Sequence, residues 1–153
     1  MKVIIFSDSH LIKTNMINAI MKESPNLILH LGDNSRDCNE LKLKFPDIPL
    51  RSVNGNCDRT SPGEEFDEFT FAGKKFFITH GHTYGVKMSL RLIIDDALSK
   101  DVDILAFGHT HIPYYAVMGT LTVVNPGSVG FLDATYAVLE IKDGVVTCDV
   151  KNI

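Results

Sequence analysis

Five short clusters of carboxylate, amide and imidazole residues each follow an apolar stretch of this chain, and this arrangement constrains the fold more than any other feature. In chain order the clusters are Asp8-Ser9-His10, Gly32-Asp33-Asn34, Gly55-Asn56-Cys57-Asp58, His80-Gly81-His82 and Gly108-His109-Thr110-His111. Five of the six histidines fall inside them. Short apolar stretches bounded in this way are typical of buried strands. Carboxylates, amides and imidazoles gathered at strand ends are the ligand types that a pair of divalent metal ions needs.

No single cluster is specific, because each has an ordinary explanation. The Asp-x-His of residues 8–10 is common by chance, and a Gly-Asp pair after a strand is an everyday turn. Asn56 alone would usually be a residue that hydrogen-bonds locally. Two separate His-x-His pairs, each at the end of an apolar strand, are much harder to explain as core or surface residues. The whole set in this order therefore predicts a metal centre.

The apolar pattern predicts alternating strands and helices at first and mostly strands afterwards. Expected strands cover residues 3–6, 27–31, 50–53, 67–71, 75–79, 104–107, 114–118, 120–124, 136–141 and 145–150, the last two joined by a turn at Lys142-Asp143-Gly144. Expected helices cover residues 14–22, capped by Thr14 or Asn15, then 36–45, and 87–99, which packs Leu90, Ile93, Ile94, Ala97 and Leu98 on one face. This order favours an α/β (α+β) fold of two packed sheets with helices outside, built as a single domain over residues 1–153.

Composition restricts the binding partners that this chain can have more than it restricts the reaction that the chain can catalyse. The net charge is −4 and the Lys and Arg residues are scattered, which argues against nucleic acid as a bulk ligand, although metal ions can supply positive charge locally. The three cysteines are far apart and form no Cys-x-x-Cys, so neither a thiolate zinc site nor a disulfide framework is expected. The sequence offers no signal peptide and no membrane-spanning stretch, so we expect a cytoplasmic protein without a membrane partner.

The chain resembles the calcineurin-like metallophosphoesterase superfamily over essentially its whole length. Beyond the clusters above, the resemblance extends to His30-Leu31-Gly32-Asp33, to Gly85-Val86-Lys87 and to Asn125-Pro126-Gly127-Ser128. These segments are similar to the small subgroup of YfcE-like and Vps29-like phosphodiesterases. The resemblance implies a four-layer αββα sandwich, in which two mixed β-sheets flanked by helices pack face to face and the metals lie at the strand ends.

The resemblance also implies two divalent metal ions per chain. One ion would be held by Asp8, His10, Asp33 and His111, and the other by Asp33, Asn56, His80 and His109, so that Asp33 bridges the two. Oxygen and imidazole ligands without a thiolate suit Mn²⁺, which is the first choice, and also Ni²⁺, Zn²⁺ and Fe. Two such ions can activate a shared hydroxide for in-line attack on phosphorus, which gives Asp33 and Asn56 catalytic roles as well.

Cys57 is the first departure from the family pattern. In much of the superfamily the third cluster reads Gly-Asn-His, and that histidine is expected to protonate the leaving oxygen. A thiol is a poor acid at neutral pH unless its surroundings lower its pKa, so Asp58 or His82 would have to compensate. We therefore expect a preference for esters with a good leaving group, such as aryl diesters. A purely structural role, in which Cys57 is a small residue that fills a turn, explains it equally well.

The second departure lies after residue 128, where the subgroup usually carries a Pro-Arg and this chain has Val129–Asp133. A positive group near the site or a subunit contact is therefore missing. The residues that we assign to substrate contacts are Asn34, Cys57 and His82. By analogy of fold we expect a homodimer or a larger homo-oligomer.

Two functions of different classes fit these observations. The first is a phosphodiesterase that acts on a small phosphodiester, with monoesters as weaker substrates. The second is a Vps29-like protein-binding scaffold with weak or no catalysis. Scaffold relatives lose histidines from the metal set, whereas every expected ligand position is filled here. A nuclease of the DNA-repair type shares the chemistry but usually carries longer insertions for DNA.

Overall fold

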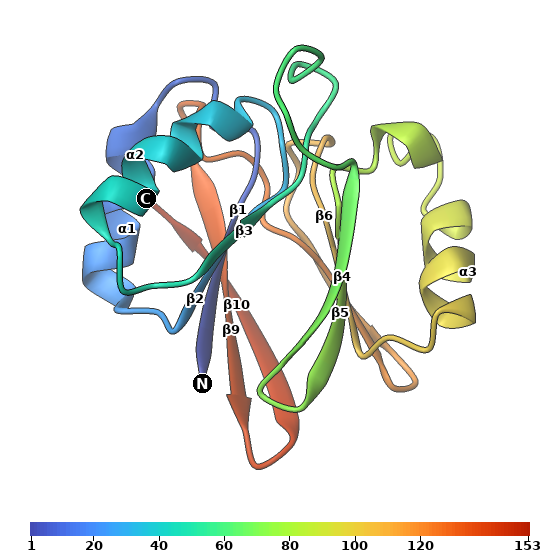
Figure 1. Cartoon of the computed structure of the whole chain (residues 1–153). Helices are drawn as coiled ribbons and strands as arrows, with labels where there is room; N and C mark the ends of the chain where they lie inside the picture. The colour runs from blue at the N-terminus through green and yellow to red at the C-terminus, as the bar shows by residue number, and fades with distance from the viewer.

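The structure is a computed structural model that describes residues 1–153 and contains two five-stranded β-sheets (Figure 1). Sheet A has the strand order β10 (Val145–Asn152), β9 (Thr135–Lys142), β1 (Lys2–Phe6), β2 (Leu27–His30) and β3 (Leu50–Ser52). Sheet B has the order β4 (Phe66–Phe71), β5 (Lys74–Thr79), β6 (Ile104–Phe107), β8 (Leu121–Asn125) and β7 (Tyr114–Met118). Both sheets combine parallel and antiparallel pairs, as the prediction of two mixed sheets requires.

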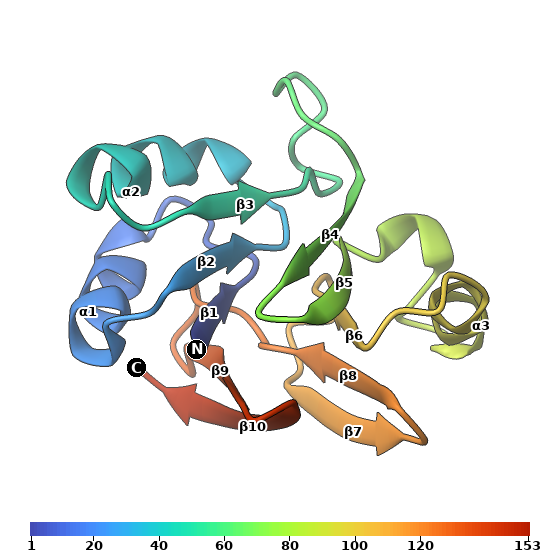
Figure 2. The same ribbon diagram turned by 60° about the horizontal axis from the view of Figure 1, so that its bottom comes forward.

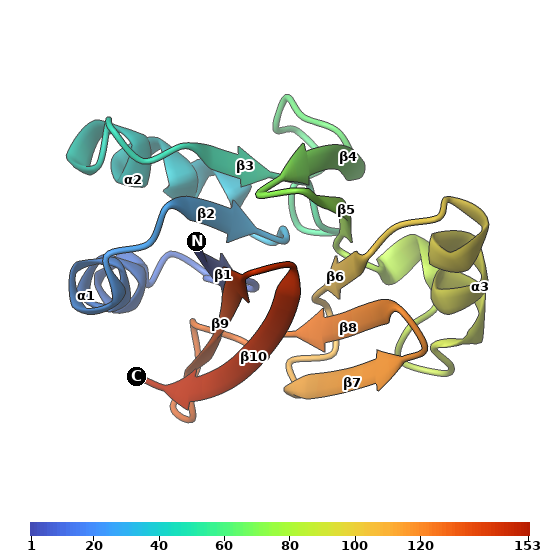
Figure 3. The ribbon, with the colours of Figure 1, turned by 90° about the horizontal axis from the view of Figure 1, so that it is seen from below.

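Helices cover the outer face of each sheet and complete four layers (Figure 3). Helices α1 (Lys13–Glu23) and α2 (Cys38–Lys44) lie on sheet A, and α3 (Arg91–Ser99) lies on sheet B at the opposite side of the molecule. Two short 3₁₀ turns, η1 (Ser35–Asp37) and η2 (His82–Tyr84), follow strand-end clusters. The predicted αββα sandwich is therefore confirmed. No helix is long and apolar enough to cross a bilayer.

Alternation of side chains along β1 explains how the layers are joined. Val3 and Ile5 belong to the core between the two sheets, where Ile78 of β5 is also buried. Ile4 and Phe6 point the other way and pack with residues of α1. Because both faces of the strand are covered, residues 3–6 form one uninterrupted apolar run. Burial of each such side chain stabilises the fold by about 1.5–3 kcal/mol.

Parallel pairing brings the polar clusters to one edge of the molecule. Strands β1, β2 and β3 run in the same direction in sheet A, as Figure 2 shows, and β5 runs parallel to β6 in sheet B. The register aligns Phe6 with His30, and Thr79 with Phe107. The residues that follow these strands therefore emerge at the same level, where the two sheets meet.

Most expected elements are present, and the differences are at helix ends. Helix α3 begins at Arg91 rather than at residue 87, and Leu98, expected in the core, is 53% exposed. Helix α1 begins at Lys13 without a side-chain cap, so the capping assigned to Thr14 or Asn15 is wrong. The Asn15 side chain instead donates a hydrogen bond to the Val129 carbonyl. Tertiary contacts outweighed the local capping preference here.

The hairpin predicted between the last two strands is confirmed. The connection consists of Asp143 and Gly144, both with positive φ (52° and 78°), which is the geometry of a two-residue type I′ turn. The helix expected over residues 36–45 is split into η1 and α2. These differences leave the strand ends, and hence the polar clusters, where the pattern predicted them.

Candidate metal centre

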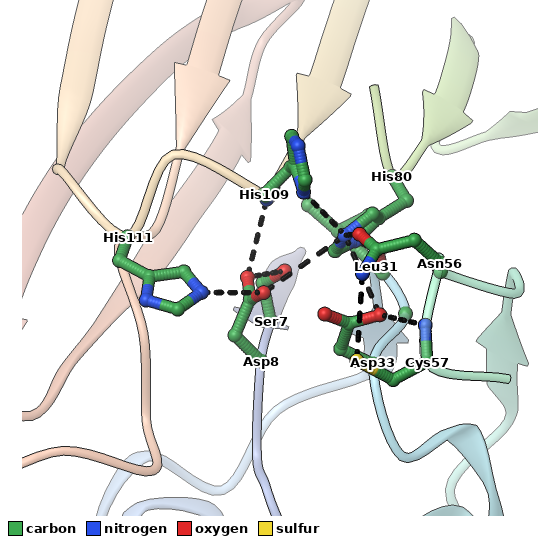
Figure 4. Close-up of polar contacts among 12 residues, drawn as sticks. Ser7, Asp8, Leu31, Asp33, Asn56, Cys57, His80, His109 and His111 are labelled. Atoms are coloured by element: carbon green, nitrogen blue, oxygen red, sulfur yellow. Dashed lines mark hydrogen bonds and ion pairs between the residues drawn. The ribbon is translucent and has the colours of Figure 1, made fainter. Parts of the chain in front are cut away.

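All seven predicted metal ligands lie in the loops that follow β1, β2, β3, β5 and β6. Figure 4 labels six of them, all except His10. Sheet A contributes Asp8, His10, Asp33 and Asn56, and sheet B contributes His80, His109 and His111. Figure 4 shows His111 on one side of Asp8 and His80, with Asn56 and Cys57 on the other side. The loops thus bring together groups that are up to 103 residues apart in sequence.

The backbone of these loops is strained at the ligand positions. Of the eleven non-glycine residues with positive φ, five are predicted ligands: Asp8 (55°), His10 (44°), Asp33 (58°), His109 (67°) and His111 (60°). Each such conformation costs of the order of 1–3 kcal/mol and persists where the surrounding structure enforces it. Strain concentrated in this way is typical of functional sites. It turns side chains at the ends of strands toward one point.

Two glycines allow the loops to approach one another closely. A Cβ at Gly55 would overlap the Asp33 carboxylate, and a Cβ at Gly108 would overlap the Ser7 hydroxyl. Neither glycine requires a positive φ, so the reason for glycine is space. Both residues therefore set the distance between the loops that carry the predicted ligands.

The first group of ligand atoms consists of Asp8, His10 and His111, whose atoms all lie within 4.8 Å of one another. His111 Nε2 lies 3.0 Å from Asp8 Oδ1. His10 Nε2 is buried and has no hydrogen-bond partner. An unpartnered buried nitrogen is costly in the absence of a ligand, and a bound cation would satisfy it. These residues fit a metal ion.

The second group is centred on His80, which is fully buried. Its Nδ1 lies 2.7 Å from the Leu31 carbonyl, which can only accept, so Nδ1 carries a proton and Nε2 is the nitrogen that can offer a lone pair to a ligand. Around that Nε2 lie Asn56 Oδ1 at 3.2 Å, His109 Nδ1 at 3.1 Å and Asp33 Oδ1 at 3.6 Å. Such a convergence of potential acceptor atoms is what a cation site requires.

The carboxylate common to both geometric groups is Asp8, whereas the resemblance implies that Asp33 bridges. The second group comprises Asp8, Asp33 and His80, with His80 Nε2 3.9 Å from Asp8 Oδ1. Asp33 Oδ1 accepts a hydrogen bond of 2.8 Å from the Cys57 N–H. Burial raises the pKa of Asp33, but this hydrogen bond and the nearby His80 and His10 outweigh it and lower the pKa. Asp33 is therefore ionised at neutral pH.

Two histidines of sheet B, His109 and His82, are held in the form that binds metals. Burial, with help from His80 and Lys87, lowers the pKa of His109 to about 4. Burial and His80 also lower the pKa of His82. Both rings are therefore neutral near pH 7, and a neutral imidazole offers a lone pair to a cation.

A buried hydrogen-bond chain supports the first cluster from behind. Gly32 N–H donates to His30 Nδ1 (3.3 Å), His30 Nε2 to Ser9 Oγ (3.1 Å), and Ser9 Oγ to Asp37 Oδ2 (2.7 Å). Burial lowers the pKa of His30 to about 4, which keeps the ring neutral. Asp37 also accepts the Leu11 N–H at 3.0 Å. His30 is thus a supporting residue, and the roles of Ser9 and Asp37 were missed from the sequence.

The Asn125-Pro126-Gly127-Ser128 segment supports the same loops from sheet B. Asn125 Nδ2 donates to the Gly108 carbonyl at 2.9 Å, and Ser128 Oγ donates to the Asp8 carbonyl at 2.8 Å. Both residues are buried. The resemblance of this segment to the family was the only sequence signal for a role near the metal centre.

The residues assigned to acid catalysis and substrate contacts differ in how well they are placed for those roles. Asp58 is buried and accepts the N–H groups of Ser35 and Gly55, each at 2.9 Å, so it braces the loop and is poorly placed as an acid. Cys57 is exposed as a residue, but partial desolvation of its thiol and the nearby Asp33 raise the pKa of that thiol. The His82 ring lies 5.4 Å from the His80 ring, and its Nδ1 has no partner. Asn34 is half-buried in a turn beside Asp33.

In comparisons with known proteins, the chain is similar to phosphoesterases. The sequence model of the calcineurin-like phosphoesterase superfamily domain matches residues 1–144. The chain is 29% identical to the probable metallophosphoesterase YsnB of Bacillus subtilis over 154 residues, which cover 96% of this chain and 88% of that protein. It is 31% identical to the phosphodiesterase YfcE of Escherichia coli K12 over 104 residues, which cover 58% of this chain and 51% of that protein.

Among solved structures, wild-type Vps29 complexed with Zn²⁺ from Entamoeba histolytica has a similar fold. The TM-score is 0.76 at 20% sequence identity, and the alignment covers 99% of each chain. At this level of identity the likeness concerns the fold alone. It matches the two-sheet architecture described above and does not choose between catalysis and a scaffold.

Proposed function

Because the chain belongs to the calcineurin-like phosphoesterase superfamily, we propose that it is a metal-dependent phosphodiesterase that works with two divalent ions. The observation that carries the proposal is that two histidine nitrogens in the candidate centre, His10 Nε2 and His80 Nε2, are placed to bind cations. His10 Nε2 is buried without a partner, and potential acceptor atoms surround His80 Nε2. Both features are unfavourable in the protein alone and favourable with cations bound.

We assign the ligands as the family resemblance implies. Asp8, His10, Asp33 and His111 would hold one ion, and Asp33, Asn56, His80 and His109 would hold the other. Mn²⁺ is the proposed metal, with Ni²⁺, Zn²⁺ or Fe as alternatives, because the donor set is oxygen and imidazole. When bound, the ions supply a Lewis-acidic clamp for phosphoryl oxygens and acidify a water nucleophile.

The chain's own residues orient the ester and handle the proton of the leaving group. Cys57, whose pKa is raised, keeps its proton at neutral pH and is a weak acid toward an alkoxide. His82 has an unpartnered Nδ1 beside the second group and is the better placed proton carrier. Neither group is a strong acid, which supports a preference for aryl diesters, whose leaving groups need little protonation.

The competing proposal is a Vps29-like scaffold with weak or no catalysis. Metal binding alone does not separate the two functions, since a Vps29 structure with Zn²⁺ exists. The full complement of ligand side chains favours the enzyme. Turnover is therefore the decisive measurement.

The test uses metal-stripped protein that is re-supplied with Mn²⁺, Ni²⁺, Zn²⁺ or Mg²⁺ and assayed on bis(p-nitrophenyl) phosphate. We expect metal-dependent release of nitrophenol, lost in Asp33→Asn and retained in Asp47→Asn, a matched change at an exposed carboxylate outside the site. Folded, metal-loaded protein without turnover on any metal would favour the scaffold. Aryl and alkyl diesters cleaved at equal rates, with chemistry limiting, would disprove the leaving-group preference.

We further propose that residues 1–153 act as a single domain and that the protein forms a homodimer or larger homo-oligomer. The continuous core shared by the two sheets supports the first statement. The second is tested by sedimentation equilibrium of the full chain. A monomer at micromolar concentration would contradict it.

A further inference from the structure

Two cavities flank the candidate metal centre, one on each side. One cavity of about 350 Å³ includes His111 in its wall, and the other, of about 360 Å³, includes Asn56. Figure 4 places His111 and Asn56 on opposite sides of Asp8 and His80. A group bound at the metals therefore has open space in two directions. Both volumes fall in the range of small-molecule sites, roughly 300–1,000 Å³.

The cavity beside His111 has one apolar side, formed by Phe131 and Leu132, and Ser128 and Asp133 complete its wall with polar side chains. Phe131 is 52% exposed although its ring centroid lies 4.9 Å from that of His111 and 5.2 Å from that of His10. Leu132 is fully exposed in the same wall. Ile112, which directly follows His111, is 69% exposed and lines a separate, neighbouring cavity. Large apolar side chains gathered around a polar centre mark a surface that binds something apolar.

The cavity beside Asn56 is the opposite in character, because no hydrophobic residue lines it. Its wall includes Arg59, Glu65 and His82, which provide hydrogen-bond donors and acceptors. The loop is ordered by the Asn54 side chain, which donates to the Ser61 carbonyl at 3.0 Å. The cavity therefore has an ordered backbone, from which the exposed side chains of Arg59 and Glu65 can reach a polar group that enters it.

We propose that the natural substrate is a phosphodiester with two unlike ester groups. An aromatic group lies against Phe131 and Leu132, and a hydroxyl-rich group, such as a nucleoside or sugar, hydrogen-bonds with Arg59 and Glu65. The inference rests on the proposed phosphodiesterase function and adds the substrate class. The two ester oxygens of a diester diverge from phosphorus, so a phosphate at the metals can direct one group into each cavity.

The apolar wall fits a small aromatic group better than a protein partner. The Phe131 ring rests on the rings of two predicted ligands, and the cavity beside it opens at His111 itself. A protein that covered this surface would also obstruct the metal centre. Its binding would then oppose catalysis rather than extend it.

The test compares three diesters that release the same p-nitrophenol and differ in the second group, which is methyl, p-nitrophenyl or thymidine. Wild-type protein loaded with Mn²⁺ should have its highest kcat/KM with the thymidine ester. Leu132→Ser should lower kcat/KM about tenfold for all three, the loss expected for one apolar contact. Its matched control is Leu43→Ser, which changes another largely exposed leucine (84%) on α2, outside both cavities, and should leave kcat/KM unchanged.

Arg59→Gln and Glu65→Gln should lower kcat/KM for the thymidine ester about fivefold to tenfold and leave the methyl ester unaffected. Metal content is measured for every variant and should stay at the wild-type value. Kinetics of Leu132→Ser identical to those of Leu43→Ser would overturn the apolar subsite and leave Phe131 and Leu132 as a surface for a protein. An equal loss on all three esters in Arg59→Gln would overturn the polar subsite. Wild-type protein inactive on every ester would instead refute the proposed function itself.

Discussion

The two sheets contribute different chemistry to the same centre. Sheet A supplies Asp8, Asp33 and Asn56 with a single imidazole, His10, whereas sheet B supplies imidazoles only. Neither sheet alone offers the mixture of charge and lone pairs that two divalent ions need. The centre therefore exists only where the sheets meet, and bound ions would connect the two halves of the molecule.

The sheets also differ in how they hold their ligands. Sheet A holds its first cluster mainly with a buried chain of its own residues, Gly32, His30, Ser9 and Asp37, to which Ser128 from the sheet B side adds one hydrogen bond. Sheet B depends on its neighbour, because His80 is oriented by the Leu31 carbonyl of the loop after β2. The imidazole side of the centre is thus oriented in part by the carboxylate side.

The largest expected effect comes from removing single carboxylates of sheet A. Asp8→Asn and Asp33→Asn should each lower kcat/KM roughly a thousandfold, because each removes a charge at the reacting centre. If Asp33 bridges the ions, Asp33→Asn should bind fewer than one ion per chain and Asp8→Asn should keep one. Metal analysis of dialysed protein measures this. The reverse pattern would identify Asp8, the carboxylate common to both geometric groups, as the bridge.

Metal removal should weaken the connection between the sheets. At a metal concentration a thousand times Kd, binding stabilises the folded state by about 4 kcal/mol. For a chain of 153 residues this corresponds to a fall in Tm of roughly 8–16 °C when a chelator is added. Calorimetry with and without chelator measures the shift, and His80→Ala should reduce it. An unchanged Tm in wild-type protein would show that the sheets do not depend on the ions.

The support within sheet A should appear as a pH dependence of stability. The pKa of His30 is about 4 in the folded state, because burial disfavours the charged ring, and near 6.5 when unfolded. The unfolded chain therefore binds the proton first as pH falls, so stability is lost between pH 6.5 and 4, by about 3 kcal/mol. Urea unfolding of metal-free protein at pH 7, 5.5 and 4.5 measures this. His30→Asn should be less stable at pH 7 and lose less on acidification; parallel curves would contradict the assignment.

The strand-end clusters were predictable because they depend on local pattern. An apolar run followed by Asp-x-His or His-x-His indicates where a strand ends, and parallel pairing then brings the ends together. The start of α3 at Arg91 was not predictable, since residues 87–90 have the same apolar spacing as the helix itself.

Details of the centre that depend on contacts between separate loops were also beyond the sequence. The partnership of Ser9 with Asp37 joins residues from two separate loops. The hydrogen bond that Asp58 accepts from the Ser35 N–H likewise joins two separate loops. Positive φ at Asp8 and His109 accompanies the hydrogen bond from the His109 N–H to Asp8 Oδ2 (3.2 Å). Asp and His adopt this conformation more often than most non-glycine residues but do not require it, so residue type alone does not predict it.

The smallest expected effects come from ion pairs outside the metal centre. One pair lies on the sheet A side and one on sheet B, so their contributions to stability can be compared. Glu23 of α1, on the sheet A side, is buried, and its carboxylate accepts hydrogen bonds from Lys2, Lys151 and the Tyr136 hydroxyl. Burial raises the pKa of Glu23, but these partners lower it overall. Glu68 of sheet B pairs with Lys100 while both side chains stay partly exposed. Glu23→Gln should therefore lower the free energy of unfolding by about 2 kcal/mol and Glu68→Gln by less than about 0.5 kcal/mol. Equal losses in urea unfolding would show that burial does not distinguish the two pairs.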